Sequence, residues 1–132
     1  MAEAKAILSD YRQSPRKVRI VADMVRGKKV ADAIITLSFI PKRSALPLQK
    51  LLASALANAK NLSLPTENLI VKEIRVDGGK ILYRSQPRSH GQANPIRKRT
   101  THVQITLAEG APKKLKKARA NRLAKVSPST KS

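Results

Sequence analysis

The feature of this sequence that most constrains its fold is a stretch of 21 residues, Gly79 to Arg99, with six Lys or Arg residues and no acidic residue. Strand patterns flank it, because residues 69–77 are rich in Ile and Val and residues 101–107 alternate apolar and polar side chains. A connection of this length without a core of its own is uncommon in a compact domain and indicates either function or disorder. We expect an extended arm that leaves the domain and binds a polyanion; the alternative is a flexible surface loop with solvated charges.

The tip of this arm is expected between Pro87 and Pro95, where Gly91 and Asn94 are residue types that tolerate turn geometry. If both halves of the arm continue the flanking strands at roughly 3.3 Å per residue, the tip lies on the order of 30 Å from the domain. The Gly-Gly-Lys sequence at 78–80 is interpreted as a bend where the arm departs.

The charge of the chain points to nucleic acid as its partner. The 132 residues include 28 Lys and Arg against 8 Asp and Glu, which gives a net charge of +20. The surplus is uneven, since residues 79–132 contain 14 basic residues and a single acidic one. We expect residues 1–109 to form one domain that includes the hairpin at about 79–100, followed by a basic C-terminal extension at 110–132. That extension is interpreted either as a solubilising tail or as a segment that RNA orders.

Other classes of protein fit the composition poorly. No run of 18 or more apolar residues and no signal-peptide pattern is present, so a membrane is not the expected partner. The absence of Cys excludes disulfides, zinc knuckles and thiol catalysis. Only three aromatic residues occur, too few for a base-stacking platform, so phosphate and shape recognition are expected.

Residues typical of catalysis are also missing. The only two histidines are His90 and His102, and neither has an acidic residue nearby in the sequence. Neither a metal-ligand set nor a phosphate-binding Gly loop is recognisable, since the Gly-Lys-Lys at 27–29 lacks the leading glycine. We therefore expect no enzyme activity, no metal site and no cofactor.

The first half of the chain predicts a strand and three helices. Residues 2–9 alternate as a strand, and Ser14-Pro15 is typical of an N-cap and first position of a helix that ends at Gly27. A second, short helix begins at Val30, and Ser44 is a candidate cap for a third. Three sets of residues at helical spacing are expected to face the core: Val18, Val21, Ala22 and Val25; Val30, Ala33, Ile34 and Leu37; and Leu48, Leu51, Leu52, Ala55, Leu56, Ala59 and Leu62.

The first helix carries a basic face opposite its apolar one. Arg16, Arg19 and Arg26 share this face with a single acid, Asp23. Arg12 precedes the helix, and Lys28 and Lys29 follow it. We interpret the set as a nucleic-acid contact, with an ordinary solvated helix face as the alternative.

Four segments in this order resemble the uL22 family of large-subunit ribosomal proteins. They are SPRKVRIVADMVRGKKVADAI, PKRSALPLQKLLASALANAKN, LIVKEIRVDGG and PRSHGQANPIRKRTTHVQITL, and the resemblance runs from about Lys5 to Leu107. It implies an α+β fold with three helices packed on a small three-stranded antiparallel sheet and a long β-hairpin, whereas the basic tail after Gly110 is not part of the family pattern. It further implies a structural constituent of the cytoplasmic large ribosomal subunit, with an organellar ribosome as an alternative. Ribosomal RNA, neighbouring ribosomal proteins and, at the hairpin tip, the nascent peptide in the exit tunnel are the implied partners.

Charge pattern and resemblance together predict two sets of site residues. The RNA-binding set is Arg12, Ser14, Arg16, Lys17, Arg19, Arg26, Lys28, Lys29, Lys80, Arg84, Arg88, Arg97, Lys98 and Arg99. The tunnel-facing tip is Arg88, Ser89, His90, Gly91, Gln92 and Ala93. Charged residues common at the tip in this family are replaced here by His90, Gln92 and Asn94. Two alternatives remain at this point, an architectural DNA-binding protein with a basic β-arm and an RNA-acting enzyme, and the missing chemistry disfavours the second.

Overall fold

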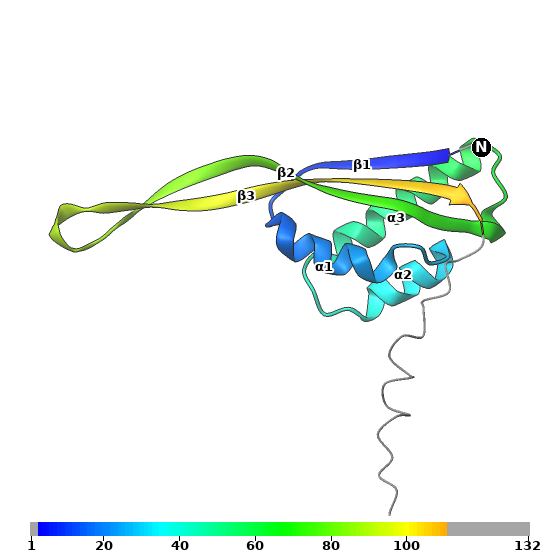
Figure 1. The fold of residues 1–132 in the computed structure, drawn as a ribbon, viewed down its shortest axis with the longest axis horizontal. Helices are drawn as coiled ribbons and strands as arrows, with labels where there is room; N and C mark the ends of the chain where they lie inside the picture. The colour runs from blue at the N-terminus through cyan, green and yellow to red at the C-terminus, as the bar shows by residue number, and fades with distance from the viewer. Residues whose placement is uncertain (1–2, 111–132) are drawn as a thin grey trace, which may run out of the picture.

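The computed structural model of this chain, which describes residues 3–110, consists of two layers and one long projection (Figure 1). The first layer is a three-stranded antiparallel sheet of β1 (Glu3–Tyr11), β2 (Leu69–Pro87) and β3 (Ala93–Glu109). The second layer is formed by α1 (Pro15–Val25), α2 (Val30–Phe39) and α3 (Ala45–Asn61), on one face of the sheet. This confirms the predicted α+β class with three helices. Residues 1–2, where the first strand was expected to begin, and most of the expected extension at 110–132 lie outside the described residues.

The strand order is β1-β3-β2, so β3 is central and the other two strands are edges. β1 pairs with β3 from Glu3↔Ala108 to Tyr11↔Thr101 and then ends. Beyond that point only β2 and β3 continue, paired as far as Pro87↔Ala93. We call this two-stranded projection, residues 79–99, the arm, and the rest of residues 3–110 the body. From Thr101 to Ala93 a strand extends roughly 26 Å, in line with the expected reach.

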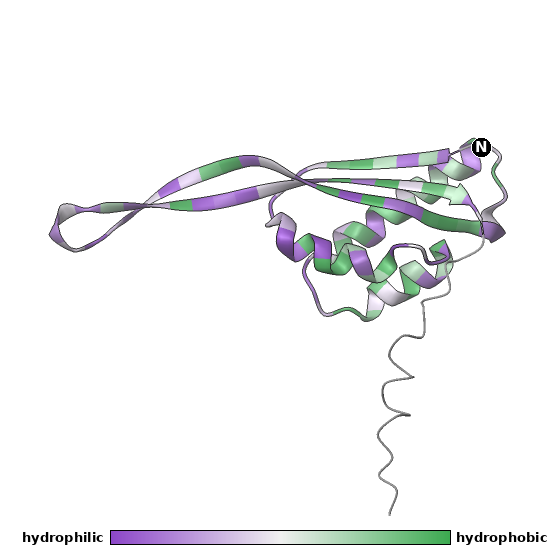
Figure 2. Cartoon of the chain, viewed as in Figure 1, coloured by the Kyte–Doolittle hydropathy of each residue, from purple (hydrophilic) through white to green (hydrophobic). Residues whose placement is uncertain are grey.

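The core lies between the sheet and the helices. In Figure 2, hydrophobic residues recur along the helices and the body strands, whereas β3 carries a continuous hydrophilic segment in the arm. The residues predicted to face the core from α1 are all at most 1% exposed. Leu48 and Leu52 of α3 are equally well buried, and each contributes about 1.5 to 3 kcal/mol to the stability of the fold. The prediction for Leu62 was wrong: it is 57% exposed, because α3 ends one residue before it.

Both predicted helix caps occupy the N-cap position, but neither serine side chain makes the predicted hydrogen bond. The backbone amide of Lys17 donates its hydrogen bond to the Ser14 carbonyl at 3.0 Å, so it is not available to the Ser14 hydroxyl. Ser44 is buried and has helical dihedral angles, whereas an N-cap hydroxyl reaches the helix from the extended region. The predicted stop at Gly27 is confirmed, since its φ of 76° ends α1 in the left-handed region.

The α-helices α1, α2 and α3 have 11, 10 and 17 residues. None within residues 3–110 is both long and apolar enough to cross a lipid bilayer.

Candidate nucleic-acid interface

The arm leaves the body at an irregularity in the β2–β3 ladder, between Gly78 and Ile81. A Cβ atom on Gly79 would lie 2.5 Å from the Thr100 hydroxyl oxygen and 2.8 Å from the His102 ring, so a larger residue there would displace one or both of these side chains. The Thr100 hydroxyl donates a hydrogen bond to the Lys80 carbonyl at 2.6 Å. The interpretation of residues 78–80 as the point of departure is confirmed, and this close packing fixes the direction of the arm.

Strand pairing distributes the cations of the arm over both of its faces. Residues directly opposite each other point to the same face, and successive residues alternate between faces. Arg97 and Arg99 therefore lie on one face, opposite Tyr83 and Ile81, while Lys98 and Arg84 lie on the other, opposite Leu82 and Ile96. Each of these four cations is opposite an apolar or aromatic side chain, so no two like charges are paired across the strands.

No carboxylate neutralises these charges. Body cations such as Arg75 form ion pairs, here with Asp77 at 2.8 Å, and Lys72 pairs with Glu3. None of the ion pairs within residues 3–110 involves a residue of the arm. The side chains of Arg84, Arg97, Lys98 and Arg99 are exposed, so the arm presents positive charge that is not paired with a carboxylate on both of its faces.

The tip of the arm is tighter than the sequence indicated. The strands include Pro87 and Pro95, which were expected to bound a loop, and Asn94 pairs with Gln86 instead of occupying a turn. In a two-stranded ribbon each strand has a free edge. Proline, which has no N–H to donate, is tolerated where its nitrogen faces that edge. The turn itself is the 3-10 helix Ser89–Gly91, in which His90 and Gly91 both have positive φ. The Arg88 amide donates to the Gln92 carbonyl at 2.7 Å and closes it.

All six predicted tip residues, 88–93, are exposed and lie at the far end of the arm. None of them touches the body, so this part of the chain contributes nothing to the core.

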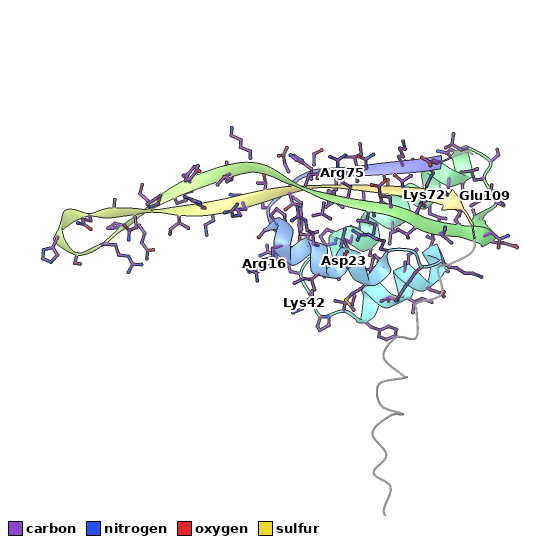
Figure 3. The ribbon with its side chains drawn as sticks, viewed as in Figure 1. Arg16, Asp23, Lys42, Lys72, Arg75 and Glu109 are labelled. Carbon is purple, nitrogen blue, oxygen red and sulfur yellow. The ribbon has the colours of Figure 1, made fainter. Side chains whose placement is uncertain are left out.

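The basic residues of α1 fall into two groups. Arg16 and Lys17 are exposed, and Figure 3 shows Arg16 projecting from the start of α1 on the side away from the sheet. Arg19 instead donates to the Val76 carbonyl from Nε at 3.1 Å and from Nη2 at 2.9 Å. Arg26 donates to the Ile74 carbonyl at 3.1 Å and also forms an ion pair with Asp23. Sequence reasoning missed this role, because the partners are strand carbonyls and not side chains.

The segment after α1 continues along the same edge. The Gly27 amide donates a hydrogen bond to the Val71 carbonyl at 3.0 Å, and the Val71 amide donates one to the Lys28 carbonyl at 2.9 Å. Lys29 and Ile70 form an isolated antiparallel β-bridge. Together with Arg19 and Arg26, this segment covers the free edge of β2 within the body, which would otherwise expose unpaired backbone groups. The Lys28 side chain is half-buried and donates to the Thr36 hydroxyl at 3.2 Å, whereas Lys29 is exposed.

Three predicted residues from two segments of the chain meet at the base of the arm. Arg12, which follows β1, lines an open groove together with Lys80 and Arg84 of β2. The groove has a volume of about 490 Å³, and Asp10, Leu82 and Thr100 complete its lining. Its three cations outnumber its single acid and favour a polyanionic ligand. Ser14 is half-buried at the start of α1.

Two further features bear on the chemistry of the site. Asp10, in the left-handed region with φ of 53°, donates its amide to His102 Nδ1 at 3.2 Å, a partner that the sequence did not reveal. Within the described part of the chain, no group of three His, Asp or Glu side chains could hold a metal ion.

An ion pair between the two outer strands connects Lys72 of β2 with Glu3 of β1. The hydrogen bond and the charge of Lys72 lower the pKa of Glu3.

Comparison with known proteins agrees with this geometry. Residues 6–108 match the family model described as ribosomal protein L22p/L17e. The large ribosomal subunit protein uL22 of Desulfitobacterium hafniense is 51% identical over 110 residues, which cover 83% of this chain and 96% of that protein. The protein with the same name from Streptococcus pyogenes serotype M6 is 47% identical over 110 residues, with the same coverage.

Proposed function

Because this chain belongs to the ribosomal protein L22p/L17e family, we propose that its arm and the start of α1 bind large-subunit ribosomal RNA and that its tip lines the peptide exit tunnel. At the coarser level, the chain is a structural protein of the cytoplasmic large ribosomal subunit and not an enzyme. The family match also favours RNA over the DNA-binding alternative. Neighbouring ribosomal proteins and, at the tip, the nascent peptide are the other proposed partners.

The observation that carries the RNA proposal is the placement of cations on both faces of the arm. A ribbon that lies on a surface needs charge on one face only, whereas a ribbon enclosed by nucleic acid meets phosphates on both. Arg97 and Arg99 supply one face, and Arg84 and Lys98 supply the other. The arm therefore fits a position inside folded RNA, with the body remaining outside it.

The rest of the predicted set divides according to its contacts. We propose direct phosphate contacts for the exposed cations whose side chains make no hydrogen bond to a distant part of the protein, which are Arg12, Arg16, Lys17, Lys29, Lys80, Arg84, Arg88, Arg97, Lys98 and Arg99. Arg19, Arg26 and Lys28 are already hydrogen-bonded to protein groups, so we assign them to holding the interface in shape. The domain boundary near residue 109 follows the end of β3 and is also a proposal.

Two double variants test the enclosed arm. Arg84→Gln with Lys98→Gln removes the charge of one face, and Arg97→Gln with Arg99→Gln removes that of the other. Each should weaken binding to large-subunit RNA and reduce the log–log salt slope by about 1.4 to 1.8, since each phosphate contact contributes about 0.7 to 0.9. Filter binding over a range of salt concentrations measures both quantities.

The matched control is Lys50→Gln with Lys60→Gln, which removes two exposed charges of α3 outside the predicted set. This control should leave the slope nearly unchanged. If only one arm variant changed the slope, the arm would lie on RNA instead of within it, and if neither did, the RNA assignment would fail.

A further inference from the structure

A second surface, remote from the arm, is apolar. Of the eight large apolar side chains that are exposed within residues 3–110, four lie together between α1 and α2: Ile20, Met24, Ile35 and Phe39. They line an open groove of about 590 Å³, which Ile40 and Pro41 extend. Phe39 is 81% exposed, an unusual position for the only phenylalanine of the chain.

This groove is not needed for the fold. The inward faces of α1 and α2 are already occupied by other residues, such as Val18, Val25 and Leu37, which are at most 2% exposed. Each of the two helices thus has a second apolar stripe that faces outward. A contiguous exposed apolar patch of this kind marks an interaction site, and Met and aromatic residues are enriched at the centres of protein interfaces.

The one charged side chain in the lining of the groove is basic, and Asp32, the acid in the first turn of α2, is not part of that lining. Lys42 forms part of the lining and lies in the segment that follows α2 (Figure 3). Lys28 is next to Thr36, another lining residue, and donates to its hydroxyl. The nearest acid on α1, Asp23, is paired with Arg26 at 2.8 Å. A complementary partner therefore brings apolar anchors together with carboxylates.

This complementarity selects among possible occupants. A second copy of the chain carries a net charge of +20, and the segment 111–132 contains eight basic residues and no acid, so both would be repelled. RNA would neutralise the two lysines and a base can stack on Phe39, but the remaining Ile, Met and Pro side chains of the lining offer the polar base edges few hydrogen-bonding groups. A protein segment with aliphatic or aromatic side chains and neighbouring carboxylates complements both the apolar lining and the two lysines.

We propose that this groove docks an apolar segment, flanked by Asp or Glu, of a neighbouring protein of the large subunit. The proposal rests on the assembly of this chain into that subunit. It adds a protein-binding surface on the α1–α2 side of the body to the RNA-binding arm.

The test is photocrosslinking in assembled subunits of the full-length chain. Phe39 is replaced by p-benzoylphenylalanine, which at an 81% exposed position leaves the fold intact. The control carries the same photoreactive residue at Tyr83 of the arm, an aromatic position that is 57% exposed. Large subunits are isolated by sedimentation, irradiated, and the adducts are separated into protein and RNA fractions and sequenced.

Position 39 should yield an adduct with one ribosomal protein, at a segment with apolar residues and adjacent carboxylates, while position 83 yields adducts with RNA. Lys42→Glu in the Phe39-substituted chain should lower the protein adduct yield about two- to fivefold, and Lys60→Glu should not. An RNA adduct, a self-adduct, a segment without carboxylates or no adduct at position 39 would overturn the proposal. If the chain failed to sediment with large subunits, the proposed function would fail instead.

Discussion

Arg19 offers the sharpest test of how the arm is anchored, because its guanidinium forms hydrogen bonds to the backbone of the protein itself. Two of its nitrogens donate to the Val76 carbonyl, which belongs to the edge strand β2 close to the point where the arm begins. Replacing it by Met keeps most of the apolar stem and removes both donors. The carbonyl is then left facing α1 with only water as a donor.

The loss of unfolding free energy in Arg19→Met can be estimated from these hydrogen bonds. A hydrogen bond from a charged donor contributes about 1.5 to 3 kcal/mol to stability when it is buried. The Arg19 side chain is exposed, so water replaces part of the interaction, and we expect Arg19→Met to lose about 1 to 2 kcal/mol. For a domain of this size, a loss of about 1.5 kcal/mol lowers the melting temperature by roughly 5 to 8 °C.

Thermal unfolding followed by circular dichroism of the three helices measures this loss, since the chain has no Trp for fluorescence. The matched control is Arg16→Met, three residues earlier on the same helix, whose side chain is exposed and makes no hydrogen bond within the described residues. Arg16→Met should change stability by no more than about 0.5 kcal/mol but should weaken RNA binding. Arg19→Met should do the reverse, with RNA affinity per folded molecule unchanged.

The reasoning would be refuted if Arg19→Met melted at the temperature of the unaltered protein and bound RNA more weakly. The Arg19 side chain would then leave the strand carbonyl and contact phosphate when RNA is present.

Three further outcomes are expected. Gly79→Ala should destabilise the protein by about 1 to 3 kcal/mol in urea unfolding, because its Cβ displaces the Thr100 hydroxyl, and the stability should return in part when Thr100 is also changed to Ala. Deleting residues 88–93 should leave the melting temperature of the free protein nearly unchanged, since the tip lies off the body, but should alter chemical reactivity of the exit tunnel in assembled subunits; unchanged reactivity would remove the tunnel assignment. The lowered pKa of Glu3 means that its ion pair stabilises the fold above the ordinary Glu pKa and is lost as the pH falls through the lowered value, and Lys72→Met should return the carboxyl titration, followed by NMR, to its ordinary range.

Local periodicity accounts for what the sequence predicted well. The burial of Val18, Val21 and Val25 follows from helical spacing, and the arm follows from a long acid-free stretch between two strand patterns. Both signals lie within about twenty residues of chain. The termination of a helix one residue early, which exposes Leu62, depends on the loop that follows and leaves no trace in the periodicity.

Contacts between distant residues explain what sequence reasoning missed. Arg19 and its strand partner are 57 residues apart, and a helical face of arginines looks the same in the sequence whether it contacts phosphate or backbone. The outward stripe of Ile35 and Phe39 was equally hidden, because apolar residues on a short helix are expected to face a core. The contacts of Arg19 and the exposure of Ile35 and Phe39 become apparent only in the three-dimensional structure, where helices and sheet pack together.

The pairing of cations with apolar residues along the arm also determines which alignment of its two strands is stable. Sliding β3 along β2 by one residue in one direction would place Arg84 directly opposite Arg97, and sliding it the other way would place Lys80 opposite Arg99. Either slip brings two positive side chains within about 5.5 Å of each other at their Cβ atoms, which is destabilising, and moves every side chain of the sliding strand to the other face. A ribbon with no core to hold its alignment thus resists misfolding through electrostatic repulsion, and the same charges that attract the polyanion keep the hairpin in a single alignment before it arrives.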